Sequence, residues 1–135
     1  MINRKIFISI SLLTLLNFII INYSASFLDY KLPDSSSYLN YSPKYKSFYP
    51  FLINFVDSLN LNLIYVQILF LSFSIIFLIF SIFKKYNLFI SLVLYIAIII
   101  NFFYTSFSKT ILTESIFFGL INIGIGLFVI NNRKN

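Results

Sequence analysis

The side chains best suited to chemistry in this chain are its four carboxylates, Asp29, Asp34, Asp57 and Glu114. The 135 residues include no His and no Cys. The chain therefore lacks the commonest general base and metal ligand, and it lacks thiol nucleophiles, disulfides and thiolate metal sites. Proton transfer and metal binding fall mainly to the four acids. Three of them lie in one polar segment, about residues 23–60, and Glu114 begins the last apolar segment.

Asp34 allows two interpretations. It follows Pro33 and precedes three serines, Ser35–Ser37, so its side chain could cap a short helix that begins near Ser35. A carboxylate in an ordered loop beside a membrane could also act as a general base or as a ligand of a divalent cation. The local sequence leaves both roles open.

Glu114 lies in what we expect to be the first turn of the last membrane helix. The helix dipole favours an acid there by about 0.3–1 kcal/mol, which would account for its presence. An acid inside the membrane boundary is also costly unless it faces protein or water, so a functional role is equally open. We interpret Asp29 and Asp57 as solvated or capping residues, and Gln67 as an interhelical hydrogen-bonding residue rather than a ligand contact.

The composition is typical of a membrane protein. The chain is 59% hydrophobic and 10% charged, with a mean hydropathy of +0.91, and a soluble domain of this size cannot bury so much apolar surface. Four apolar segments reach, with flanking residues, the roughly 20 residues that a transmembrane helix needs. We expect one all-α, polytopic membrane domain over residues 1–135. Its helices would cover residues 5–23, 61–83, 87–104 and 111–130, with an outer loop at 24–60.

The net charge of +6 is arranged as a topology signal rather than as a nucleic-acid surface. Six basic residues lie at the ends of expected helices that would be cytoplasmic if the N-terminus is inside: Arg4, Lys5, Lys84, Lys85, Arg133 and Lys134. Four would lie outside with all the carboxylates: Lys31, Lys44, Lys46 and Lys109. Short basic inner loops follow the positive-inside rule. We therefore predict a cell (inner) membrane protein with both termini cytoplasmic, the lipid bilayer as its surroundings, and no nucleic-acid partner.

A cleaved signal peptide is a second interpretation of the first segment. It has a basic start, an apolar core and the small-residue pattern Ser24-Ala25-Ser26. The apolar run over residues 6–21 is long for a signal, however, and three further apolar segments follow. We expect a retained helix.

The expected outer loop is too apolar and aromatic to be a disordered linker. Residues 48–56, with Pro50 in the first turn, predict a short helix along the outer membrane interface. A shorter helix is expected after Asp34. At the other side of the membrane, the basic stretch over residues 84–87 predicts a tight turn between two antiparallel helices.

Polar and small residues within the apolar segments predict helix packing. Asn17 and Asn22 should face other helices or the interface, because an amide facing lipid would lack partners. Gly119 and Gly126 are seven residues apart and so share one helix face. Their spacing predicts ordinary close packing of helices rather than a dimer motif.

Short motifs recur near the ends of the expected helices. After a basic start and one membrane helix come Leu32-Pro33-Asp34-Ser35-x-x-Tyr38-Leu39 and then Tyr49-Pro50-x-Leu52. Val66-Gln67 lies in the second helix, and Ile111-Leu112-Thr113-Glu114-Ser115-Ile116-Phe117 opens the fourth. This series, which covers nearly the whole chain, resembles the N-terminal portion of GT-C superfamily glycosyltransferases. The nearest branch is the bacterial relatives of dolichyl-phosphate-mannose–protein mannosyltransferases and aminoarabinose transferases.

The resemblance implies a role for each candidate residue. Asp34 would be the essential acid of the first outer loop, accepting the proton of the attacking hydroxyl or helping to hold a divalent cation. Glu114 would line the outer mouth of the same cavity as an accessory acid. Tyr38 and Tyr49 would stack on sugar or support the loop. The implied substrate is a polyprenyl-phosphate-linked sugar, from which a hexosyl or pentosyl group is transferred.

Length sets this chain apart from that family, whose members are several times longer and carry later helices that complete the lipid-phosphate cavity. We therefore expect a truncated portion, a fragment, or a half that needs a membrane-protein partner. The alternative function is that of a small non-catalytic multi-pass membrane protein, either an assembly subunit or a degenerate remnant. A small multidrug-type transporter fits less well, because such proteins need a charge near the bilayer centre.

Overall fold

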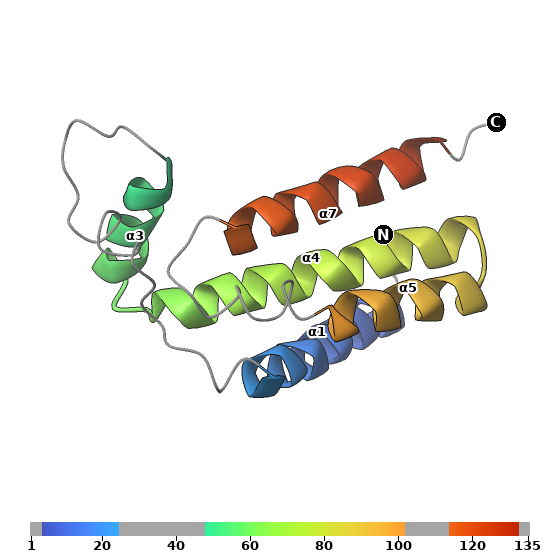
Figure 1. Cartoon of the computed structure of the whole chain (residues 1–135), viewed down its shortest axis with the longest axis horizontal. Coiled ribbons are helices and arrows are strands. Elements are labelled where there is room, and N and C mark those ends of the chain that lie inside the picture. Colours follow the sequence, from blue (N-terminus) through green and yellow to red (C-terminus); the bar gives the residue numbers. More distant parts are fainter. Residues whose placement is uncertain (1–3, 25–47, 102–113, 133–135) are drawn as a thin grey trace.

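The fold is a bundle of long helices with one short helix lying across its end (Figure 1). A computed structural model describes residues 4–24, 48–101 and 114–132. Those residues form five helices and no strand, which confirms the all-helical prediction. The helices are α1 Arg4–Ser24, α3 Phe48–Ser58, α4 Leu63–Lys85, α5 Leu88–Ile100 and α7 Glu114–Asn131.

Helix α4 is the centre of the bundle. It packs against α1, α5 and α7, most extensively against α7, and it meets α3 at its beginning (Figure 1). Its sequence is apolar on all sides, which suits a helix surrounded by other helices or by lipid. The core consists of Ile21 from α1 and three α4 residues, Ile68, Leu71 and Ile75.

The four longest helices, α1, α4, α5 and α7, alternate in direction along the chain. Phe18 near the end of α1 lies against Tyr65 near the start of α4, with ring centroids 6.2 Å apart, so α1 and α4 are antiparallel. Helix α7 instead runs parallel to α4, because its early residue Ser115 meets Gln67 and its later residue Asn122 meets Ser74. Hence α1 and α5 begin at the bundle end where α4 and α7 finish.

A tight turn joins α4 to α5, as the basic stretch over residues 84–87 predicted. The Tyr86 N–H donates to the Ile82 carbonyl at 2.8 Å and ends α4. The Asn87 side chain then accepts from the Ile90 N–H at 2.9 Å and begins α5, as an N-cap does. Lys84 and Lys85 occupy the last turn of α4, where the helix dipole favours positive charge.

The predicted helix over residues 48–56 is confirmed as α3, with Pro50 in its first turn. Its end is a Schellman motif. The Leu61 N–H donates to the Val56 carbonyl at 3.2 Å and the Asn60 N–H donates to the Asp57 carbonyl at 2.9 Å. Asn60 has φ of 53°, a left-handed conformation that Asn tolerates well. This motif fixes the sharp change of direction between α3 and α4.

Two of these helices have the length and composition to cross a membrane. They are α4, with 23 residues, and α7, with 18 residues. The apolar part of α1 and the described part of α5 are shorter. Helix α5 ends at Ile100, where the Asn101 N–H donates to the Ile98 carbonyl at 3.2 Å, and the last part of the helix expected over residues 87–104 lies outside the described residues. Large apolar side chains are exposed on all five helices, for example Leu12, Phe55, Leu69, Phe89 and Phe128.

Candidate functional site at the Glu114 end of the bundle

Glu114 is the first residue of α7, and the sequence had predicted it to lie in the first turn of a helix over residues 111–130. Its side chain is half-buried, and its Oε2 atom is fully buried without a hydrogen-bond partner among the described residues. Burying a polar atom without a partner costs about 1–3 kcal/mol, and more for a charged group. The α7 dipole offsets only part of that cost. Glu114 therefore has a buried carboxylate oxygen that could accept a hydrogen bond and that no described residue engages.

The hydroxyls of Thr14 and Ser72 also have buried oxygens without a partner in the described residues. They differ from Glu114 in kind. A hydroxyl within a helix can rotate toward a carbonyl of its own backbone, whereas an ionised carboxylate oxygen requires a donor from elsewhere. The unpartnered oxygen of Glu114 is the stronger indication of a site.

Gln67 holds the start of α7 against α4. It is fully buried, and its Nε2 atom donates to the Ser115 Oγ atom at 2.8 Å. Ser115 is itself 1% exposed and follows Glu114 directly in the chain. The interhelical role predicted for Gln67 is confirmed, and the same bond positions the backbone from which the Glu114 side chain projects.

Asp57 lies at this end of the bundle as well, near the end of α3. Its side chain is exposed, in keeping with the solvated role expected for it, and its backbone carbonyl rather than its carboxylate takes part in the turn after α3. Within residues 4–24, 48–101 and 114–132, no three His, Cys, Asp or Glu side chains gather as a metal site.

The remaining candidate residues fall outside what the structure describes. Asp29, Asp34 and Tyr38 belong to residues 25–47, which lie outside the described ranges. Tyr49 is part of the α3 backbone, and its side chain is likewise outside the description. The structure thus brings Glu114, α3 and Asp57 to one end of α4, and the proposed partnership of Asp34 with Glu114 stays a prediction.

A second polar cluster joins α1, α4 and α5 on another side of the bundle. The fully buried Asn17 donates from Nδ2 to the Ser72 carbonyl at 3.5 Å, and its Oδ1 atom accepts from the Tyr95 hydroxyl at 3.1 Å. The prediction that Asn17 faces other helices is confirmed. The role of Tyr95 was missed, although a buried Tyr hydroxyl in an apolar helix usually needs a partner.

The bond between Asn122 and Ser74 was also missed. Asn122 Nδ2 donates to Ser74 Oγ at 3.2 Å across the α4–α7 interface, with both side chains buried. The signal available in the sequence was Asn122 itself, an amide in the middle of an apolar helix. These bonds secure the helices that carry the Glu114 end.

Comparison of the chain with protein families, with curated proteins and with solved structures found no match.

Proposed function

We propose that this chain is the N-terminal module of a GT-C-like membrane glycosyltransferase that takes its sugar from a polyprenyl-phosphate carrier at the outer face. The observation that carries the proposal is the buried, unpartnered Oε2 atom of Glu114 at the start of α7. The motif series that runs from Asp34 to Glu114 in the sequence is the reason for linking that atom to sugar transfer.

In this proposal α1, α4, α5 and α7 all cross the membrane. An α-helix rises about 1.5 Å per residue, so α4 is about 35 Å long and α7 about 27 Å, close to the thickness of the hydrocarbon layer. The alternating helix directions support the four crossings. They put Lys84 and Lys85 at one end of the bundle, and Asp57 and Glu114 at the other. The basic end would then be cytoplasmic.

The proposed reaction transfers the sugar from phosphate to a hydroxyl. The hydroxyl oxygen of the acceptor attacks the anomeric carbon, the bond from that carbon to the phosphate oxygen breaks, and the polyprenyl phosphate leaves. Asp34 would accept the hydroxyl proton or help to hold a divalent cation, and Glu114 would act as the accessory acid. Tyr38 and Tyr49 would stack on the sugar or support the loop.

A photolabelling experiment tests the proposal without requiring turnover by this chain alone. The chain would be reconstituted in liposomes with a polyprenyl-phosphate sugar that carries a photoactivatable group. We expect the chain to be labelled, and both Asp34→Asn and Glu114→Gln to reduce labelling at least tenfold, because a lost charge-assisted hydrogen bond costs about 1.5–3 kcal/mol. Sugar transfer, where measured in cells, should be abolished by Asp34→Asn with membrane insertion intact.

Asp57→Asn is the matched control, because Asp57 is an exposed carboxylate at the same end of the bundle. It should be labelled as well as the unchanged chain. Equal labelling of all three variants would contradict the assignment and return Asp34 to a capping role.

The second candidate is a non-catalytic membrane subunit. It is favoured by the polar side chains buried between helices, since Gln67, Asn17 and Asn122 all form bonds that hold the bundle together. That candidate predicts no labelling by the carrier analogue above the level seen with an unrelated membrane protein.

A further inference from the structure

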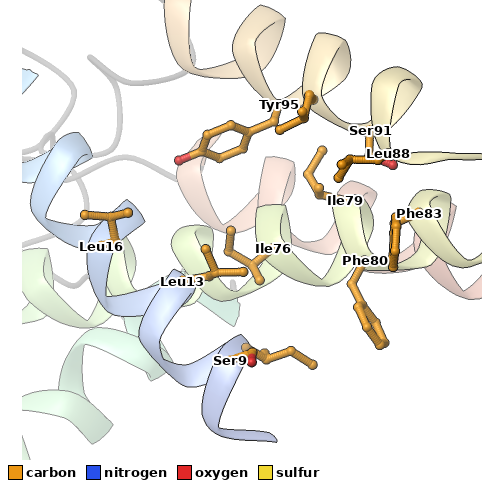
Figure 2. A pocket seen from close by; sticks show the side chains of 12 residues that line it. Ser9, Leu13, Leu16, Ile76, Ile79, Phe80, Phe83, Leu88, Ser91 and Tyr95 are labelled. Carbon is orange, nitrogen blue, oxygen red and sulfur yellow. The ribbon is translucent and has the colours of Figure 1, made fainter. Parts of the chain in front are cut away.

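A groove of about 540 Å³ lies between α1, α4 and α5 (Figure 2). Helix α4 forms its floor, with α1 on one side and α5 on the other. The lining is predominantly apolar and includes Leu13, Ile76, Ile79, Phe80, Phe83 and Leu92. These residues come from the early part of α1, the late part of α4 and the early part of α5. The groove therefore lies toward the Lys84 end of the bundle, away from Glu114.

The polar residues of the groove are already engaged. The Ser91 hydroxyl donates to the Asn87 carbonyl at 2.9 Å, and the Tyr95 hydroxyl donates to Asn17 Oδ1 at 3.1 Å. Ser9, which also lines the groove, has an interaction of its own. The surface offered to an occupant is consequently hydrocarbon, and the occupant should present hydrocarbon in return.

Positive charge marks the end of the groove. The Nζ atom of Lys84 lies 4.5 Å from the centroid of the Phe80 ring, which lines the groove, and Lys85 Nζ lies 5.5 Å from the Tyr86 ring centroid. The carboxylates in the described part of the chain, Asp57 and Glu114, are at the opposite end of the bundle. An anion at this end would therefore find lysines that no described carboxylate neutralises.

We propose that the groove binds an acyl chain of an anionic glycerophospholipid, with the lipid phosphate at Lys84 and Lys85. An apolar groove beside the last turn of α4, which carries both lysines, complements an amphiphile with a hydrocarbon tail and a negative head. The apolar surface of another helix would fill the groove but would leave the two lysines without an anion. The lipid belongs to the leaflet at the Lys84 end, so this site is separate from the one proposed at Glu114 and does not depend on sugar transfer.

The test is a titration of the full chain in detergent, followed by native mass spectrometry. Phosphatidylglycerol would be compared with phosphatidylcholine of the same acyl chains. Each lysine near an anionic lipid is worth about 1 kcal/mol and 1.4 kcal/mol is tenfold in affinity, so we expect phosphatidylglycerol to bind roughly thirtyfold more tightly. The double variant Lys84→Gln with Lys85→Gln should lose this preference and should still bind both lipids weakly.

Filling the groove should remove binding of both lipids. Leu13→Trp puts a large side chain at the groove, and Leu120→Trp is the matched control, because Leu120 is exposed on α7 and does not line the groove. Circular dichroism would check that each variant keeps its helices. Equal affinity for the two lipids in the unchanged chain would overturn the proposal, as would equal losses in the two Trp variants. A dimer of the chain that only Leu13→Trp disrupts would overturn it too, because the occupant would then be a second copy.

Discussion

Gln67 shows how a single polar side chain can organise a pair of apolar helices. Its amide is fully buried, and it reaches the hydroxyl of Ser115 on a helix that lies 48 residues further along the chain. In an apolar environment the alternative to that bond is an unsatisfied amide, which costs free energy. The bond thereby fixes which turn of α7 lies against the beginning of α4.

We predict that Gln67→Ala destabilises the folded bundle by about 1 kcal/mol, the usual size of an interhelical hydrogen bond in a membrane protein. The free energy of unfolding in detergent would measure the effect. Ser81→Ala is the matched control, because the Ser81 hydroxyl donates to the Phe77 carbonyl of its own helix at 2.7 Å and makes no described bond to another helix. If both variants unfold alike, the bond to Ser115 contributes nothing to stability.

The sequence could predict that certain polar residues bond between helices, but it could not predict which residues they bond to. Gln67 and Asn17 stand out in apolar segments, so each must find a partner inside the bundle. The partners themselves, Ser115 and Tyr95, depend on which helices become neighbours. That information is three-dimensional, and no local pattern contains it.

At the scale of helices, α4 and α7 form the closest pair through matched large and small residues. Gly119 lies against the Phe70 ring and Gly126 against the Phe77 ring. Both glycines are buried, and both leave room for an aromatic ring from α4. The expectation that these two glycines serve close helix packing is confirmed, although the sequence did not show which helix would face them.

We predict that Gly119→Ala and Gly126→Ala each destabilise the bundle by about 1–3 kcal/mol, as overpacking of a filled interior does. A Cβ atom at position 126 would lie 2.8 Å from the Phe77 ring, and one at position 119 would overlap the Phe70 ring. Thermal unfolding in detergent, followed by circular dichroism, would measure the loss.

Gly124→Ala is the control, because it is on the same helix and a Cβ atom there meets nothing within 4 Å. It should be neutral or slightly stabilising, since Ala is the better helix former. Equal losses of stability at all three positions would mean that the glycines matter for the backbone of α7 itself rather than for its contact with α4.

Helix positions were the most predictable part of the fold, because long apolar runs and charged interruptions mark them directly. The expected segments at 61–83 and 111–130 correspond to α4 Leu63–Lys85 and α7 Glu114–Asn131. The packing order was less predictable. Helices α4 and α5 are neighbours in sequence and form the expected hairpin, yet the more extensive contact of α4 is with α7. Polar pairs and glycines on α7, rather than chain connectivity, decide that contact.

At the scale of the whole molecule, the helix directions separate the described basic residues from the described carboxylates. Helix α1 begins with Arg4 and Lys5, and α4 ends with Lys84 and Lys85 at the same end of the bundle. The two described carboxylates, Asp57 and Glu114, are at the other end. This separation is the one that the positive-inside rule expects, and it places the candidate site and the proposed lipid groove at opposite ends of the bundle.

The orientation can be tested with single cysteines, because the natural chain contains none. We predict that Ser36→Cys reacts with a membrane-impermeant maleimide in intact cells, since the proposed topology puts residues 24–60, which include Asp34, outside the cell. Tyr86→Cys, in the exposed turn between α4 and α5, should react only after the membrane is permeabilised. The opposite pattern would put the acids in the cytoplasm, where a carrier-linked sugar at the outer face could not reach them. Reaction of both cysteines in intact cells would mean that α4, the longest apolar helix of the described chain, does not separate the two ends.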